Sequence, residues 1–573
     1  MNKKTLISST LAITLTCVLA GGTFVSRLAA DDDYHSDHFK FQPDTLVLSR
    51  SVYTGTASTV TIGQTLPLGC AGGANGSTVV AVPTTTTGTT TDVTVPCGVA
   101  TDNGEFPNTH DSHNVWNNSS SDGSFGVSSP IFLDNITTDG WLLGTLPLPT
   151  DQMVTSFSSK SELALNRSID GKSITFMGYQ GGTGCGGFLD SPTAPNLLDV
   201  SASNTPGVCD PTNPVITTFV STPIVPTAYY RAVAEVDDDG HLSITDGNAY
   251  SGDNGRAAIK GANGLYYMVG NDNSGNLSKK QISITPDGID LVNATGSELL
   301  VPGQTPPVPQ NITMIGRLEF GTDKPGKDTN FRGLTIFNNT VYISKGSGSN
   351  GVNTVYQVGS AGVLPTGTAA QLATVPIAIL PGFPSTAAST STAFPFGLFF
   401  ADATTLYVCD EGDGTLVTPA VNGNVADAQT LATAGLQKWS LVNGTWTMLY
   451  VLQDGLNVGV PYSVPNYPTS LNPATDGCRN ITGKVHRDGT VTIYAITSTV
   501  SANGDTGADP NKLVKVTDLL SATSLPKGDG DHDWDDLIGH FVTLRSARAG
   551  EVFRGVAFAP QDGDDRDLDD DGR

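Results

Sequence analysis

The sequence predicts an all-β fold, a β-propeller of about six four-stranded blades whose ring is closed by strands from both chain ends. Short apolar runs with period-two alternation recur along the chain, separated by turns rich in Gly, Asn and Asp. No part of the mature chain shows a helical pattern of useful length. The last apolar run, Phe553-Arg-Gly-Val, nearly repeats Phe331-Arg-Gly-Leu, so we expect an innermost strand there that has no partners downstream.

The clearest blade runs from Pro395 to Tyr450 and contains four apolar runs. Leu398–Phe400 and Leu406–Val408 flank one short turn. Gln437–Leu441 and Trp446–Tyr450 flank Asn443-Gly444, a dipeptide that favours a two-residue hairpin. Four strands in a meander make one propeller blade, so this segment serves as the reference unit.

The other elements follow in chain order. We expect strands at 45–53, 125–135 and 141–148, and a long insertion at about 69–113 between the first two. The first three strands supply the partners that the last strand lacks, which removes an open sheet edge. Inner strands open near Glu162, Gly255, Phe331, Phe396, Cys478 and Phe553, which gives six blades. Long connections leave room for a seventh.

The chain ends differ from the predicted propeller. Residues 1–30 combine Lys3-Lys4, an apolar stretch and small residues, and this pattern predicts a secretory signal. The propeller is expected over 31–560, with a further loop at about 181–228, and residues 561–573 read as an acidic disordered tail. A secreted or periplasmic location follows from the signal.

Composition excludes several partners. The net charge is −25, which disfavours nucleic acid and anionic membranes as partners. Only 15% of residues are charged, as in turn-rich exported β proteins. No stretch of the mature chain is long enough to span a bilayer, and we expect a monomer.

Six cysteines remain after removal of the signal, an even number that suggests disulfides in an exported protein. Cys70 with Cys97 and Cys185 with Cys209 each bracket a loop, so local pairing is the first choice. Cys409 and Cys478 would then join neighbouring blades. The sequence itself leaves all pairings of the six open.

The reference blade resembles the repeat of NHL and gluconolactonase-like propellers, through Pro395-Phe-Gly-Leu, a short turn and Leu406-Tyr-Val-x-Asp410. The similarity is clearest over Pro395–Asp413. It implies a propeller fold, in groups that include calcium-dependent hydrolases and lactonases as well as binding scaffolds. It implies no particular reaction, and no catalytic signature is transferred by it.

Arginine returns near the starts of the inner strands, at Arg167, Arg256, Arg332, Arg479 and Arg554. Inner strands surround the central channel, so these guanidinium groups would ring its mouth. They could bind a small anionic or carbohydrate ligand, because a guanidinium gives parallel hydrogen bonds to a carboxylate or phosphate. The alternative is that each pairs with a neighbouring acid and locks two blades together.

Oxygen-bearing residues precede these arginines and suggest calcium as a cofactor. They are Glu162, Asn254, Asn330, Asp476 and Glu551. A separate run, Asp529, Asp531 and Asp533, resembles the start of a calcium loop but lacks the usual glycine and glutamate further on. An ordinary surface loop is the alternative for this run.

The leading functional interpretation is an exported binding or scaffold protein with a ligand site at the channel mouth. A second is a calcium-dependent hydrolase or lyase acting on lactones, phosphoesters or acidic polysaccharides, with Glu162 or Glu551 as base. A third is a surface adhesion module. The sequence does not choose an enzyme over a binding protein.

Overall fold

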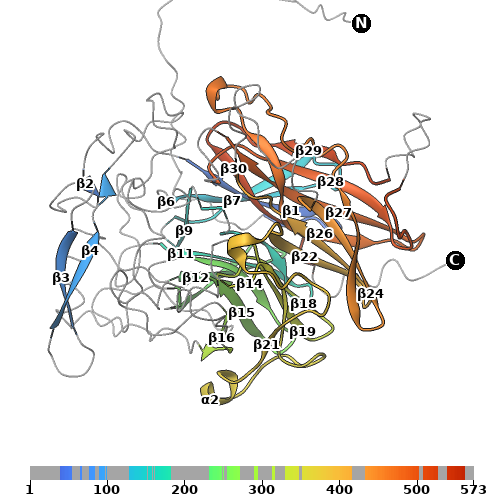
Figure 1. Ribbon diagram of the computed structural model, residues 1–573. Helices are drawn as coiled ribbons and strands as arrows, with labels where there is room; N and C mark the ends of the chain where they lie inside the picture. The colour runs from blue at the N-terminus through green and yellow to red at the C-terminus, as the bar shows by residue number, and fades with distance from the viewer. Residues whose placement is uncertain are drawn as a thin grey trace, which may run out of the picture. The chain divides into compact units, whose positions relative to one another are not determined.

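Six antiparallel sheets stand in a ring, and each occupies one blade of a propeller (Figure 1). The closing blade joins the two chain ends and has the strand order β30-β1-β7-β8. Its strands are β30 (Glu551–Phe558), β1 (Leu46–Val52), β7 (Ile131–Ile136) and β8 (Leu142–Pro147). Six blades and closure by both chain ends confirm the predicted fold.

The computed structural model describes the chain in segments, all within one compact unit, Phe39–Arg573. The segments are 39–53, 65–66, 77–83, 90–96, 98–99, 128–150, 152–157, 159–160, 162–181, 231–247, 249–250, 254–271, 289–293, 313–316, 330–346, 351–415, 433–501, 507–526 and 538–561. The predicted signal, the predicted acidic tail from 562 onwards and most of the predicted loop at 181–228 lie outside these segments.

The other five blades follow in chain order. The second contains β9 (Met153–Ser156), β10 (Asn166–Arg167), β11 (Ser173–Gln180), β12 (Arg231–Asp237) and β13 (Leu242–Gly247). The third contains β14 (Gly255–Lys260), β15 (Leu265–Gly270), β16 (Ile289–Asn293) and β17 (Thr313–Met314). The fourth contains β18 (Leu334–Phe337), β19 (Thr340–Lys345), β20 (Thr354–Val358) and β21 (Ile377–Ile379).

The fifth and sixth blades include the reference segment of the sequence. The fifth contains β22 (Pro395–Asp402), β23 (Thr405–Asp410), β24 (Gly435–Val442) and β25 (Thr445–Leu452). The sixth contains β26 (Ala474–Val485), β27 (Thr490–Val500), β28 (Lys512–Leu519) and β29 (Val542–Ser546). Asn443 and Gly444 both have positive φ, 51° and 79°, as the hairpin prediction requires.

Small elements lie in the connections between the blade strands. Two-stranded sheets pair β2 (Thr65–Leu66) with β5 (Gly98–Val99) and β3 (Ser77–Pro83) with β4 (Thr90–Pro96); β3, β4 and β5 lie within the predicted insertion, and β2 just precedes it. A strand β6 (Ser128–Ser129) pairs with β9, and the described helices are α2 (Ala369–Leu372), η4 (Ala388–Thr390) and η6 (Thr469–Leu471). None of these described helices has the length and apolar character needed to cross a membrane.

Closure depends on the antiparallel pairing of β1 with β30, from Leu46 opposite Phe558 to Val52 opposite Glu551. Figure 1 shows these strands, blue and red, in one sheet. Side chains that alternate along β1 then pack the closing blade against both of its neighbours. Leu46 and Leu48 pack with residues of the sixth blade, whereas Val47 packs with residues of the second.

The inner position of the second blade is divided between two short strands. β9 pairs with the end of β11 at Tyr179 and Gln180, and β10 pairs with its beginning at Thr175 and Ile174. Glu162 and Leu163 lie at this break, and Leu163 has a φ of 62°. A bulky residue in the left-handed region is strained, so the surrounding packing must hold it there.

The two longest connections between strands start and finish at the same end of the ring. In each blade the second and third strands are joined at the end where the inner strand begins, through residues 53–130, 181–230, 271–288, 346–353, 411–434 and 501–511. Long connections on one face of a rigid scaffold are where binding residues concentrate. Candidate binding residues are therefore expected near the beginnings of the inner strands.

Inner strands approach each other very closely at the axis. A Cβ added to Gly397 would lie 2.3 Å from the carbonyl oxygen of Arg479, and one added to Gly555 would lie 2.4 Å from that of Leu163. Glycine at this repeat position therefore permits the close approach of neighbouring blades.

We expect Gly397→Ala to lower the free energy of unfolding by about 1–3 kcal/mol, because the new methyl group meets backbone that cannot move aside. Urea denaturation would measure the change. Gly144→Ala is the matched control, since its Cβ meets only the edge of the Phe39 ring, at 3.3 Å. Equal midpoints for the wild type and Gly397→Ala would contradict the packing argument.

Candidate functional site

Four of the predicted arginines occupy one level of the ring, and we call Arg256, Arg332, Arg479 and Arg554 the arginine rim. The residue after each of them lies against a neighbouring inner strand. Ala257 forms a β-bridge with Ala164, and Asn480 Oδ1 accepts a hydrogen bond from the Val556 amide. Gly333 packs against the carbonyl oxygen of Phe396, and Gly555 against that of Leu163. All four arginines are buried. Leu163 and Phe396 hold the same position in the second and fifth blades.

Arg167 does not belong to this set. It lies in β10, four residues beyond the rim position of its blade, and its Nε donates to the carbonyl oxygen of Gly171 at 3.0 Å. The break between β9 and β10 separates Arg167 from the rim position of its blade. Leu163 occupies that position, where the other blades have arginine or phenylalanine.

Three rim arginines contact a neighbouring blade. Arg256 donates through Nη1 to the Phe331 carbonyl at 3.0 Å and to the side chain of Asn330. Arg479 pairs with Glu411 of the fifth blade, with 3.0 Å between Nε and Oε2. Arg554 donates through Nη2 to the carbonyl of Phe157 in the second blade. These contacts link blades, as one of the two interpretations of the arginines proposes.

Arg554 is only partly satisfied by these links. It is 5% exposed, and among the described residues its Nε and Nη1 have no hydrogen-bond partner. Burial lowers the pKa of its guanidinium, the Glu162 charge acts in the opposite direction, and the nearby Arg479 charge lowers it further. A buried cation with unpaired donors is unfavourable, and a bound anion would relieve the cost.

Glu162 faces the rim from the break in the second blade. Its carboxylate accepts hydrogen bonds from Thr155 Oγ1 at 2.7 Å, the Ser156 amide at 3.0 Å and Tyr179 Oη at 2.5 Å. These donors fix the carboxylate in place. Glu162 therefore contributes a positioned negative charge beside Arg554.

The other predicted oxygen ligands have separate partners. Asn254 donates to Ser159 Oγ at 3.0 Å, and Asp476 accepts from the Gly414 amide at 2.8 Å. Asn330 accepts from Arg256. Glu551 pairs with Arg50 at 3.0 Å, within a cluster that extends outward along the closing blade to Asp134.

Calcium binding stays a prediction. Among the described residues no three or more His, Cys, Asp or Glu side chains are grouped so that they could hold a metal ion. Asp529, Asp531 and Asp533 lie outside the described segments. The geometry therefore neither assigns nor tests the proposed calcium loop.

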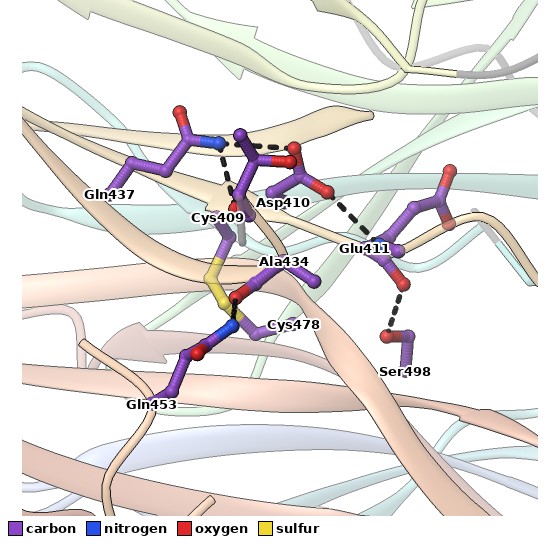
Figure 2. Close-up of a disulfide and its surroundings, with 10 residues drawn as sticks. Cys409, Asp410, Glu411, Ala434, Gln437, Gln453, Cys478 and Ser498 are labelled. Carbon is purple, nitrogen blue, oxygen red and sulfur yellow. Dashed lines mark hydrogen bonds between the residues drawn. A yellow bond between two sulfur atoms is a disulfide. The ribbon is translucent and has the colours of Figure 1, made fainter. Parts of the chain in front are cut away.

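The structure confirms one of the suggested disulfides. Cys409 of β23 is bonded to Cys478 of β26, with a Cα–Cα distance of 5.2 Å, so the bond joins the fifth and sixth blades (Figure 2). Cys70, Cys97, Cys185 and Cys209 lie outside the described residues. The bond directly precedes Arg479 on one side and Asp410-Glu411 on the other.

Asp410 and Glu411 are site residues that the sequence reading missed. Asp410 accepts hydrogen bonds from the amides of Phe394 and Gly412, at 2.9 and 3.0 Å. It also accepts from Gln437 Nε2 at 3.0 Å (Figure 2). Burial raises the pKa of Asp410 to about 7, although these bonds act in the opposite direction. Their position next to Cys409 was the available signal.

No protein-family model matches the sequence, and no curated protein matches it. Among solved structures, a glucose dehydrogenase is similar at 10% identity and a TM-score of 0.28, covering 66% of this chain and 92% of the other. The Parainfluenza Virus 5 hemagglutinin-neuraminidase is similar at 10% identity and a TM-score of 0.28, covering 77% of this chain and 86% of the other. TM-scores this low carry no argument, so the fold assignment rests on sheet topology.

Two arginine variants separate a lock between blades from a ligand-binding group. Arg256→Met leaves the buried acceptors of Asn330 and Phe331 unpaired, and we expect it to cost about 2–3 kcal/mol of unfolding free energy. Arg554→Met loses one such bond but also removes a poorly compensated buried charge, so its cost should be less than half as large. Denaturation without added ligand measures both, and equal losses would show that Arg554 is also mainly a lock.

Asp410 should make stability fall as pH rises. In the unfolded chain its pKa is about 4, so between about pH 4 and 7 the folded state keeps a proton that the unfolded state has released. We expect the unfolding free energy of the wild type, relative to Asp410→Asn, to fall by about 1 kcal/mol per pH unit across that window. Parallel pH profiles for the two proteins would contradict the raised pKa.

Proposed function

We propose that this protein is a binding protein that takes up a small anionic ligand at the arginine rim. The observation that carries the proposal is the Arg554 guanidinium, which is nine-tenths buried and has two nitrogens without partners among the described residues. Carboxylate or phosphate oxygens would complete its hydrogen bonds and compensate its charge.

The surrounding charges favour an anion rather than a cation. Arg479 lies close enough to Arg554 for its charge to lower the pKa of the Arg554 guanidinium. The Glu162 carboxylate already accepts three hydrogen bonds. A cation entering here would meet two guanidinium groups. An anion would instead bind where positive charge is buried and where the protein offers preformed donors.

A place outside the cytoplasm is part of the proposal. The disulfide between Cys409 and Cys478 supports it, because such bonds persist in oxidising compartments. The predicted signal at the N-terminus agrees with it. The hydrolase and adhesion alternatives stay predictions, since no feature of the described residues favours them over ligand binding.

Titration calorimetry of the full chain with succinate, malate and inorganic phosphate tests the proposal. We expect saturable binding of at least one of these anions with one site per chain. Arg554→Gln should weaken that binding at least tenfold, because it removes the unpaired donors and the charge.

Arg50→Gln is the matched control, since Arg50 already pairs with Asp134 and Glu551 and lies outside the rim. It should bind as the wild type does. Absence of saturable binding for all three anions, or equal affinity for Arg554→Gln and the wild type, would overturn the proposed function.

A further inference from the structure

A second unpaired group lies at the rim, on Glu411. This side chain is 4% exposed, and its Oε2 accepts from Arg479 Nε at 3.0 Å. Its other oxygen, Oε1, is buried and has no hydrogen-bond partner among the described residues. The rim therefore presents an unpaired acceptor as well as the unpaired donors of Arg554.

Glu411 is held firmly in its place. Ser498 Oγ donates to its backbone carbonyl at 2.7 Å, and the neighbouring Asp410 is tied to Gln437 (Figure 2). The disulfide at Cys409 fixes the same segment to the sixth blade. A carboxylate positioned this rigidly can discriminate between ligands, because it cannot turn away from an unsuitable group.

The order of the blades places the two unpaired groups on either side of Arg479. Glu411 belongs to the fifth blade, Arg479 to the sixth and Arg554 to the closing blade. Arg479 contacts Glu411 directly, and its charge lowers the pKa of the Arg554 guanidinium. One ligand that extends past the Arg479 guanidinium could therefore engage both groups.

The chemistry of the two groups restricts that ligand. Arg554 requires an anionic acceptor, whereas Glu411 Oε1 requires a hydrogen-bond donor. A purely anionic ligand would place negative oxygen against a buried carboxylate. An ammonium donor is disfavoured because Arg479 already supplies the positive charge next to Glu411. A neutral hydroxyl satisfies Oε1 without either conflict.

We propose that the ligand is a small hydroxylated anion, a hydroxycarboxylate or a hydroxylated phosphate ester, and that Glu411 selects its hydroxyl group. This inference rests on the proposed function, because it assigns the anionic end of the ligand to Arg554. Glu411 is the specificity-determining residue, and its effect depends on whether the ligand carries a hydroxyl.

Pairs of ligands that differ in hydroxyl groups test the inference by titration calorimetry. The pairs are malate with succinate, lactate with propionate, and glycerol phosphate with methyl phosphate. In the pair whose charged group suits the site, we expect the hydroxylated member to bind at least tenfold more tightly. The first two pairs against the third distinguish carboxylate from phosphate as the anionic group.

Glu411→Gln replaces the unpaired acceptor by an amide that can still accept from Arg479. It should abolish the preference within each pair, while the member without the hydroxyl keeps its affinity or gains some. Glu411→Asp, which retains the charge but withdraws the acceptor, gives a second variant should the amide fail to fold. Glu551→Gln is the matched control, because Glu551 forms the same kind of pair with Arg50 at 3.0 Å.

The outcomes separate this inference from the proposed function. Equal affinities within each pair, lost together in Arg554→Gln, would refute the hydroxyl selection and leave anion binding intact. A preference for hydroxylated ligands that persists in both Glu411 variants would also refute it. Absence of binding by every member would overturn the proposed function itself.

Discussion

The hydrogen-bonded pairing of β1 with β30 is the constraint on which the rest of the structure depends. It joins residues from the two ends of the chain, from Leu46 opposite Phe558 to Val52 opposite Glu551, and so completes the closing blade. Without it, the inner strand of the closing blade would have no neighbour in its own sheet, and two sheet edges would be exposed. Pairing residues so far apart in the chain costs chain entropy, and the apolar layers between blades must offset that cost.

Closure also determines what can occupy the axis. Inner strands lie very close together at one repeat position, where glycine stands in three of the blades, at Gly333, Gly397 and Gly555. The preceding position then carries long side chains at one level, and four of the six are arginine. Burying four cations requires compensation, which Asn330, Phe331, Phe157 and Glu411 provide in part from adjacent blades. Arg554 keeps two nitrogens, Nε and Nη1, that have no partner among the described residues.

The rim is a structural joint, and we propose that it is also a binding surface; these two roles have different physical signs. A group that locks blades bonds to its neighbours, as Arg256 does through Nη1 to two acceptors of the fourth blade. A group that binds a ligand would be left unsatisfied while buried, and Arg554 and Glu411 keep polar atoms that have no partner among the described residues. The Cys409–Cys478 bond supports that arrangement rigidly, so the proposed ligand would have little of the site to order.

The sequence by itself determined the propeller class, the six blade openings, the closure by both chain ends and the hairpin at Asn443-Gly444. These features depend on local alternation and turn chemistry, which are legible in short segments. It also drew attention to the arginines, although it placed Arg167 among them. Only the tertiary structure decided that Arg167 leaves the rim, that Glu411 pairs with Arg479 there, and that Arg554 keeps donors without partners among the described residues. The reason is that burial and partners arise between blades far apart in the chain, where a break such as that between β9 and β10 shifts the register by several residues.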